Sequence, residues 1–384
     1  MERVGIIGTG HTRFGVRDDA SVQELAFEAW REAVAEAAIE PSVVEASWIA
    51  AVPEYHQQRS VAGVVQEYLG LNPRPTWLTE AACASGSAAI HSAWTALRAG
   101  LYDVVAVIGC QKMTELETAQ ILALMGRVGD VQWESVFGST FPGYYALFAE
   151  RHMQLYGTTR EQLADVAIKN HHYGAMNPKA MFRKEVDRAK VLASPPVAEP
   201  LRVFDCCANA DGAACVLLAT ESATHRLGRR AVWLVGVGAA TAPMSVLRRE
   251  ELTSLPSARR AAGQAYAMAG VGPDAIDVAQ VHDCFTIAEI LAYEDLGFCE
   301  PGQGGRFVAE RRSYRGGGVA VNVDGGLKAK GHPIGATGVS MACEIVRQLR
   351  GQCRERQVEG ARVGLTHNVG GIGQYCFVNV YRGE

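Results

Sequence analysis

One cysteine stands where a nucleophile is expected. Cys83 lies in the run AACASGSAA that begins at Ala81, in which an extended segment turns into a helix of very small residues. A thiol at the start of a helix feels the positive end of the helix dipole and nearby backbone N–H groups, and both favour the thiolate. Small neighbours also let a bulky thioester approach the sulfur. The pattern therefore predicts a nucleophilic Cys83, with a small core cysteine as the alternative.

A second motif, VHDCF, begins at Val281 and contains His282 and Cys284. It follows an apolar, strand-like run and precedes an expected helix over residues 287–296. The carboxyl end of a strand is where open α/β sheets place their sites. The motif therefore offers a donor or base and a titratable thiol at the correct end of a sheet.

Two glycine-rich loops follow further along the chain. In the first, glycines flank His332, and Pro333 suits the start of a helix, so His332 can approach a ligand closely. The second, THNVGGIG from Thr366, contains Asn368 and Gly370 and lies at the end of the strand expected in the second half. Glycines without a Cβ can present backbone N–H groups to an oxyanion, although a plain tight turn is the alternative.

The elements that must hold these loops form a weak internal repeat. A strand, a helix, a strand, a helix of small residues and a strand recur in the same order in both halves of the chain. The matching pieces are 4–10 with 232–238, 48–52 with 278–281, 84–99 with 336–349 and 103–108 with 363–366. The repeat predicts a duplicated, layered α/β fold.

The opening strand ends in Gly-x-Gly, which is reminiscent of a dinucleotide-binding turn. The third glycine of that fingerprint would fall at Arg13, so the interpretation we prefer is a tight turn from strand to loop.

Residues from about 113 to 200 interrupt the repeat and are rich in aromatic residues. A long excursion from a repeated scaffold is typical of a lid or a substrate wall. The candidates for lining a pocket are Trp133, Phe141, Tyr144 and Tyr145, and an accessory core is an equal alternative for each of them.

Composition excludes several classes of protein. The 384 residues are 48% hydrophobic and 20% charged with a net charge of −4, so no nucleic-acid partner is expected. No apolar run approaches the roughly 20 residues that cross a bilayer, and the chain opens directly on a strand, which favours a cytoplasmic protein. The ten cysteines show no C-x-x-C spacing, so we expect free thiols and no metal site.

These loops, in this order, resemble the thiolase superfamily, specifically the sterol-carrier-protein-2-type thiolases and their archaeal and bacterial relatives. The specific motifs are HDCF from His282 and GHP from Gly331, and the resemblance extends to Val380. It implies a thiolase fold: two βαβαβ halves in an αβαβα arrangement with an inserted lid. The expected division is 1–112 plus about 201–225 for the N-terminal half, 113–200 for the lid and 226–384 for the C-terminal half.

The resemblance also implies roles. Cys83 would carry the acyl group, His332 would be its base, and His282 would position an ordered water in the first oxyanion hole. The backbone N–H groups of Cys83 and Gly370 would form the second hole. The family's second catalytic cysteine is replaced by Asn368 in the last loop, so Cys284 becomes the acid/base thiol.

The implied activity is that of an acyl-CoA C-acyltransferase, which cleaves or forms β-ketoacyl-CoA with coenzyme A as co-substrate and no permanently bound cofactor. The substrate could be acetoacetyl-CoA or a bulkier aromatic acyl-CoA, such as an aryl-succinyl-CoA. The enzyme would accordingly act in lipid degradation or in the degradation of aromatic compounds. The alternatives are an aldolase of the same fold acting on a sterol side-chain CoA ester, and a non-catalytic lipid or acyl-CoA carrier.

Partners follow from the same resemblance. We expect a homodimer, within a hetero-complex if a small zinc-ribbon and OB-domain protein joins it. Residues 113–200 show no basic cluster for the phosphates of CoA, which predicts weak CoA binding by the chain alone.

Overall fold

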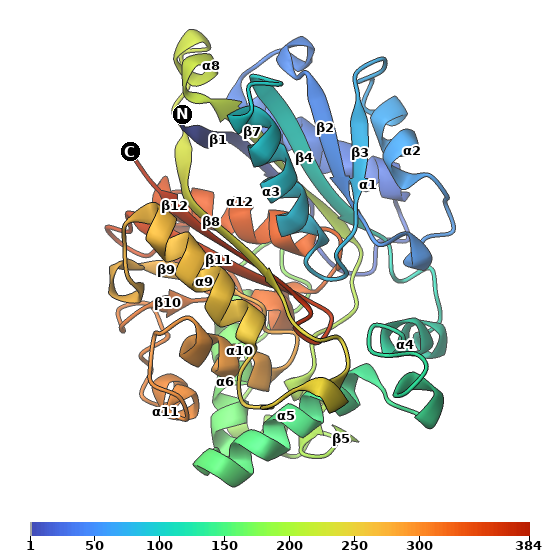
Figure 1. The fold of residues 1–384 in the computed structure, drawn as a ribbon, viewed down its shortest axis with the longest axis vertical. Helices are drawn as coiled ribbons and strands as arrows, with labels where there is room; N and C mark the ends of the chain where they lie inside the picture. Colours follow the sequence, from blue (N-terminus) through green and yellow to red (C-terminus); the bar gives the residue numbers. More distant parts are fainter. Residues whose placement is uncertain (1) are drawn as a thin grey trace.

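The computed structural model describes residues 2–384, and ten of its twelve strands form one mixed sheet (Figure 1). In the sheet the strands follow the order β10-β9-β11-β12-β8-β1-β7-β4-β2-β3, and β5 and β6 form a separate hairpin. The strands are β1 (Val4–His11), β2 (Ala46–Ala50), β3 (Thr76–Thr79), β4 (Val104–Gln111), β5 (Pro196–Ala198), β6 (Leu201–Arg202), β7 (Gly212–Thr220), β8 (Val232–Thr241), β9 (Val278–Val281), β10 (Ala320–Val321), β11 (Val363–Gly370) and β12 (Tyr375–Arg382).

The sheet consists of two halves with the same strand order. The N-terminal half reads β3-β2-β4-β7-β1 and the C-terminal half reads β10-β9-β11-β12-β8. The halves meet where β1 pairs with β8 through only two residue pairs, Gly5 with Trp233 and Ile6 with Val232. The predicted duplication is confirmed, and each half has two strands more than the repeat indicated.

Helices cover both outer faces of the halves and fill the layer between them. On the outside, α1 packs on β1 and β7, and α9 packs on β8 and β12; between the halves, α12 contacts β7, β11 and α3. The arrangement is the expected αβαβα (Figure 1). The helices are α1 (Val22–Ala37), α2 (Val61–Tyr68), α3 (Ser85–Arg98), α4 (Thr118–Gly126), α5 (Phe141–Tyr156), α6 (Arg160–Ala175), α7 (Arg188–Leu192), α8 (Glu221–Arg226), α9 (Pro256–Ala269), α10 (Thr286–Asp295), α11 (Gly304–Ala309) and α12 (Thr337–Leu349), with a π-helical turn η7 (Gly326–Lys330).

Glycines in the first strand of each half let a helix lie directly on that strand. A Cβ at Gly10 would come within 1.8 Å of the carbonyl oxygen of Ala29 in α1, and one at Gly238 within 1.9 Å of that of Ala261 in α9. The preference for a strand-to-loop turn at the opening Gly-x-Gly was wrong, because β1 continues through these glycines to His11. Their function is close packing of a helix on a strand.

The two central helices touch at their first turns. A Cβ at Gly86 of α3 would lie 2.7 Å from the backbone nitrogen of Val339, and one at Gly338 of α12 would lie 2.3 Å from that of Ser87. The small residues that the sequence shows at both helix starts therefore bring the loops before them together.

The segment between β4 and β7 holds α4 to α7 and lies apart from the sheet, at the end where α10 and α11 are found (Figure 1). Helix α6 packs against α10, α11 and η7. Among residues 2–384, no helix is long and apolar enough to cross a membrane.

Candidate active site

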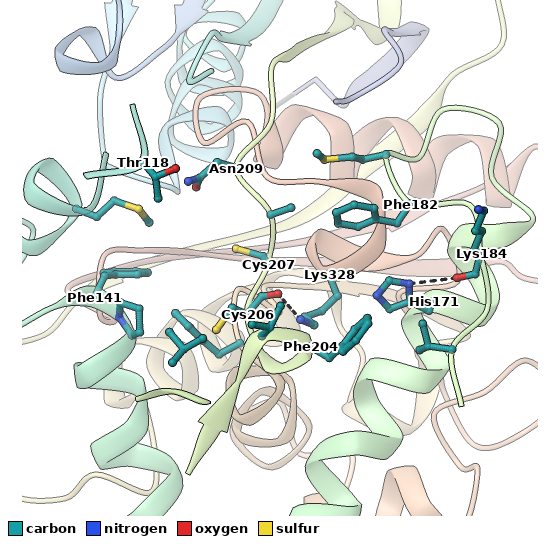
Figure 2. A pocket seen from close by; sticks show the side chains of 18 of the residues that line it. Thr118, Phe141, His171, Phe182, Lys184, Phe204, Cys206, Cys207, Asn209 and Lys328 are labelled. Carbon is teal, nitrogen blue, oxygen red and sulfur yellow. Dashed lines mark hydrogen bonds between the residues drawn. The ribbon is translucent and has the colours of Figure 1, made fainter. Parts of the chain in front are cut away.

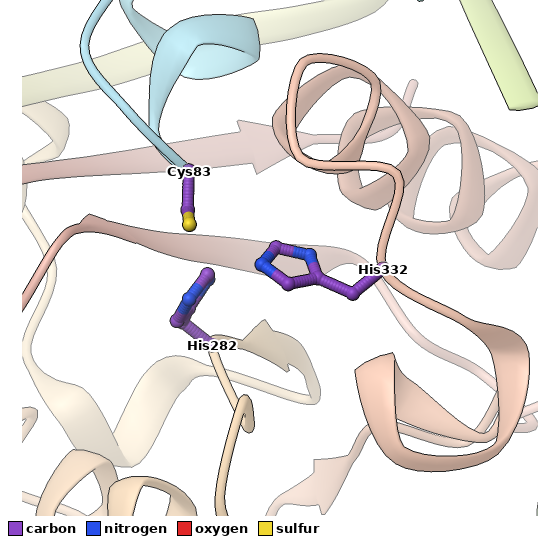
Figure 3. Close-up of side chains that lie close together, drawn as sticks. All are labelled: Cys83, His282 and His332. Atoms are coloured by element: carbon purple, nitrogen blue, oxygen red, sulfur yellow. The ribbon is translucent and has the colours of Figure 1, made fainter. Parts of the chain in front are cut away.

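Three loops place Cys83, His282 and His332 around one point (Figure 3). Cys83 stands two residues before α3, His282 directly follows β9, and His332 lies between η7 and α12. One sulfur or nitrogen atom from each lies within 4.8 Å of the other two, and all three side chains are buried. The three residues that the sequence singled out from separate motifs therefore form one cluster.

The turn that presents Cys83 is conformationally restricted. Ala82 adopts the left-handed region with φ of 51°, which L-residues with a Cβ rarely occupy. The hydroxyl of Ser85 donates to the carbonyl of Ala82 (2.6 Å) and accepts from the backbone N–H of Ala81 (2.9 Å), which holds the turn. No local pattern predicts this conformation, because alanine is not a residue that favours it.

The hydrogen bonds of His332 fix its tautomer. The hydroxyl of Thr337 donates its one proton to the carbonyl oxygen of Pro333 (3.0 Å). It must therefore accept from Nδ1–H of His332, which lies 2.7 Å away. Nε2 of His332 is then unprotonated, and it is buried without a hydrogen-bond partner within the described part of the chain. That free lone pair is what a base for Cys83 requires.

His282 carries its proton on the opposite nitrogen. Nδ2 of Asn368 donates to the carbonyl oxygen of Cys83 (3.0 Å), which fixes the amide's orientation, and its second proton points to Nδ1 of His282 (3.3 Å). Nδ1 of His282 is therefore an acceptor, and Nε2 carries the proton. This Nε2–H has no partner among residues 2–384 and is buried, so it is free to donate to a bound oxygen.

The thiol of Cys83 is neutral in the resting protein. Burial raises the pKa of Cys83 to about 12, and the backbone amides of Gly371 and of Cys83 itself oppose this rise only in part. The sequence indicated only that the helix start favours the thiolate, and burial acts in the opposite direction because it disfavours the charged form. Burial, reinforced by Lys330, lowers the pKa of His332 to about 3, so a neutral imidazole faces a neutral thiol.

Cys284 lies in the same buried region. Burial raises the pKa of its thiol well above the usual value, Cys207 and Cys83 add to this effect, and Tyr145 opposes it. Tyr145 is also buried, donates to the carbonyl of Gly371 (3.1 Å) and stacks on Phe285. Cys284 is therefore protonated at neutral pH and is a possible proton donor.

Gly370 ends β11 so close to the cysteine turn that an added Cβ would lie 2.3 Å from the carbonyl of Ala81. The amide that acts on the Cys83 thiol belongs to its neighbour Gly371. A role for the Gly370 N–H as an oxyanion donor stays a prediction.

A cavity of about 320 Å³ opens onto Cys83. Its apolar wall includes Tyr55, Met125, Phe141 and Ile334. This volume can hold a small acyl group beside the sulfur.

A larger cavity of about 920 Å³ shares Met125 and Phe141 with the first and carries several cationic side chains (Figure 2). These are Arg13, Arg183, Lys184, Lys190 and Lys328. The expectation that residues 113–200 offer no basic cluster was wrong, because Arg183, Lys184 and Lys190 face one cavity although the sequence spreads them over eight positions. Cys206 and Cys207 line it too.

The four aromatic residues that were candidates for lining a pocket lie in different environments. Phe141 lines both cavities and Tyr145 contacts the glycine loop, whereas Tyr144 is buried beside Glu134 and Trp133 is 63% exposed. Of the candidates for lining a pocket, only Phe141 belongs to the walls of these two cavities; Trp133, Tyr144, Tyr145 and Asn368 do not.

The sheet with two equivalent halves and a buried Cys-His-His cluster defines an α/β enzyme of duplicated fold. Residues 4–222 match the thiolase N-terminal domain and residues 238–382 match the thiolase C-terminal domain-like family. The chain therefore belongs to the thiolase family and is an acyltransferase of that family.

Several relatives resemble it over almost its full length. An acetyl-CoA acetyltransferase of Methanothermobacter thermautotrophicus is 39% identical over 99% of this chain and 100% of its own. The benzoylsuccinyl-CoA thiolase subunit BbsB of Thauera aromatica is 35% identical over 96% and 95%, and sterol carrier protein 2 of Bos taurus is 34% identical over 99% and 72%.

Solved structures share the fold. The Ltp2-ChsH2(DUF35) aldolase superposes with a TM-score of 0.85 at 24% identity over 100% of this chain and 98% of that one. Human mitochondrial 3-ketoacyl-CoA thiolase gives a TM-score of 0.79 at 17% identity over 100% and 99%.

Proposed function

We propose that this enzyme transfers acyl groups between CoA thioesters through an acyl-Cys83 intermediate, in thiolysis of a β-ketoacyl-CoA or in its reverse, condensation. The observation that carries the proposal is the pair of opposite tautomers at the thiol: His332 presents a lone pair and His282 presents an N–H.

The first half of the reaction uses both histidines. The sulfur of Cys83 attacks the β-keto carbon while its proton moves to Nε2 of His332. The bond between the α and β carbons breaks, which leaves the acyl group on Cys83 and an enolate of the shorter acyl-CoA. Nε2–H of His282, directly or through a water, stabilises the enolate oxygen, and Cys284 gives its proton to the carbon.

The second half restores the enzyme. The thiol of a second CoA attacks the acyl carbon on Cys83 and passes its proton to Cys284. The bond between the acyl carbon and Cys83 breaks, and Cys83 leaves as a thiolate that takes back the proton held by His332. We place the oxyanion of this step against the backbone amides of Cys83 and Gly370.

The two cavities suit the two parts of the substrate. The acyl group would occupy the cavity of about 320 Å³ at Cys83, and CoA the one of about 920 Å³, where the cationic side chains can meet its phosphates. Acetoacetyl-CoA is our first candidate, in line with relatives named acetyl-CoA acetyltransferases at 39% and 38% identity. The 35% identical benzoylsuccinyl-CoA thiolase subunit supports an aromatic β-ketoacyl-CoA as the second.

An aldolase or a carrier role fits less well. Neither needs a thiol with a free base and a free donor aimed at it, and the aldolase among the solved structures shares the fold at 24% identity. Cys83, His282 and His332 could also surround a metal ion, but we propose none because Nε2 of His282 carries a proton.

Partners and location stay predictions, as does the division into two halves and a lid. We propose that the homodimer forms through β3. This strand lies at the edge of the sheet, no strand among residues 2–384 pairs with its outer side, and Trp77 and Leu78 are 41% and 42% exposed there. The basic side chains at the large cavity remove the reason for expecting weak CoA binding, so a zinc-ribbon and OB-domain partner would serve another purpose. We expect a cytoplasmic enzyme.

The test is a steady-state thiolysis assay of the pure chain with acetoacetyl-CoA and with an aromatic β-ketoacyl-CoA, in which the concentrations of substrate and of CoA are varied in turn. We expect CoA-dependent cleavage, with a higher kcat/KM for the substrate class that fits. Lys184→Ala should raise the KM for CoA with kcat nearly unchanged. The control is Ala189→Ser, which changes an exposed residue next to Lys190 that does not line the cavity. Absence of cleavage of both substrates would contradict the proposal.

A further inference from the structure

A buried polar network beneath the cluster has no part in the chemistry above. Asp283, between His282 and Cys284, accepts hydrogen bonds from the backbone N–H groups of Leu327 (2.7 Å) and Lys328 (3.2 Å). Both belong to η7, the turn that leads to His332. One carboxylate therefore joins the motif of His282 and Cys284 to the loop of His332.

The lid reaches this carboxylate through α6. Nδ2 of Asn170 donates to Oδ2 of Asp283 (2.8 Å) and to Oε2 of Glu289 in α10 (2.7 Å). Nζ of Lys169 pairs with Oε1 of Glu289 (2.5 Å) and donates to the carbonyl of Val321 (2.7 Å). Lys169, Asn170, Asp283 and Glu289 are all fully buried. Asn170 thus joins the two interior carboxylates, and Glu289 also accepts from Nδ2 of Asn322 (2.9 Å) and from the hydroxyl of Tyr293.

The segment after α6 supports the same loop with further hydrogen bonds. Nδ2 of Asn177 donates to the carbonyl of Asp324 (2.8 Å), and the backbone N–H groups of Met181 and Phe182 donate to the carbonyls of Lys330 (3.0 Å) and Ala329 (2.9 Å). Met181 and Phe182 also line the large cavity. The lid is therefore bonded to the loop of His332 along its length, and not only at Asp283.

We propose that Lys169 and Asn170 are positioning residues: from the lid helix they hold Asp283, and through it the loop that carries His332, in the geometry that acyl transfer needs. The inference rests on the proposed acyl-transfer function. Stability alone is a poor explanation for the network, because a buried ion pair is often no more stabilising than apolar residues of similar volume.

The network also predicts how activity depends on pH. Asp283 accepts two backbone N–H groups best as a carboxylate, yet burial and then Glu289 raise its pKa to about 7. The groups that face it are Glu289 and Tyr293 from α10, Lys169 from α6, Lys328 of the loop, and the thiols of Cys207 and Cys284. Loss of Lys169 or of the Asn170 donor removes support for the ionised form and must raise this pKa further.

The experiment compares Asn170→Ala and Lys169→Met with Glu294→Gln, a control that changes another buried glutamate of α10, bonded to His152 and to the backbone of Gly304. We expect Asn170→Ala to lower kcat about 10- to 100-fold at pH 7 with KM within about twofold, and to move the acid limb of kcat/KM to higher pH. Glu294→Gln should lower Tm and leave both kcat and the pH profile unchanged.

Amide hydrogen exchange at Leu327 and Lys328, measured without substrate, tests the inference even if acyl transfer itself is absent or if Lys169→Met does not fold. Exchange should speed up about tenfold or more in Asn170→Ala and stay unchanged in Glu294→Gln. Unaltered exchange in Asn170→Ala, or an unaltered pH profile with kcat within about twofold, would overturn the positioning role. A wild-type chain without acyl transfer would instead contradict the proposed function.

Discussion

At the scale of single residues, two histidines present different groups to one buried thiol: His332 an unprotonated nitrogen and His282 an N–H group. Asn368 sets this difference on one side, because its amide donates both to His282 and to the carbonyl of Cys83. An amide is neither an acid nor a base at neutral pH, so we expect Asn368 to orient His282 and not to transfer a proton.

Asn368→Ala should lower kcat about 100-fold, because His282 is then free to carry its proton on Nδ1 and lose the donor that faces the substrate. The KM should change little, since the amide does not line either cavity. Steady-state kinetics checks this, with Asn379→Ala, a buried asparagine on β12 that bonds His91, as the control. A normal kcat in Asn368→Ala would show that the tautomer of His282 does not matter.

Cys284→Ala should lower thiolysis at least about 100-fold, because no other group is then placed to protonate the departing carbon. Cys206→Ala, which changes a cysteine on the wall of the large cavity, should keep kcat within about threefold. The same turnover assay separates the two variants. Equal losses in both would mean that Cys284 acts through packing, not as an acid.

Much of this site could be predicted from the sequence because each motif follows a strand, and strand ends converge. Cys83 follows β3, and His282 and Cys284 follow β9, as that argument expects, whereas His332 follows the π-helical turn η7 and Asn368 lies inside β11. The ionisation state of Cys83 could not be predicted, because it depends on burial by residues distant in the sequence. Lys169 and Asn170 were missed for the same reason: they stand in a helix with no local pattern that marks them.

At the scale of elements, the contact between α3 and α12 determines how far apart Cys83 and His332 lie. Both helices begin with small residues, as the sequence shows. In the structure these residues allow the first turns of the two helices to touch. The glycines of β1 were misread as a turn, because a glycine inside a strand looks the same as one at its end until the helix that packs on it is known.

Gly338→Ala should destabilise the protein by about 1–3 kcal/mol, because the new methyl group would lie 2.3 Å from both Oδ1 of Asn368 and the backbone nitrogen of Ser87. Gly263→Ala on α9, where nothing lies within 4 Å, should be neutral or slightly stabilising. Urea denaturation of the two variants gives the comparison. A neutral Gly338→Ala would mean that the two helices separate easily, and the close contact would then have no role in the site.

At the scale of the whole molecule, buried carboxyl groups make stability depend on pH. Burial raises the pKa of Asp295 to about 7, although its side chain accepts from Ser254 (2.5 Å) and from the backbone of Leu255 (2.7 Å) at the start of α9. The folded state therefore keeps a proton that the unfolded chain releases near pH 4. Because the native state binds more protons between about pH 4 and 7, this group makes stability fall as pH rises through that range.

Asp295→Asn should flatten that fall, by an amount whose upper limit is about 4 kcal/mol for three pH units. Chemical denaturation at several pH values between 4 and 8 measures it, with wild type in parallel. Curves for the two proteins that stay parallel over the whole range would show that Asp295 titrates normally.

Intact-protein mass spectrometry after mixing with acetoacetyl-CoA shows whether Cys83 carries the acyl group. We predict a mass increase of one acetyl group on the wild-type chain, lost when CoA is added and absent in Cys83→Ala. An unmodified wild-type chain that nevertheless turns over substrate, or the same adduct in Cys83→Ala, would contradict the acyl-cysteine mechanism.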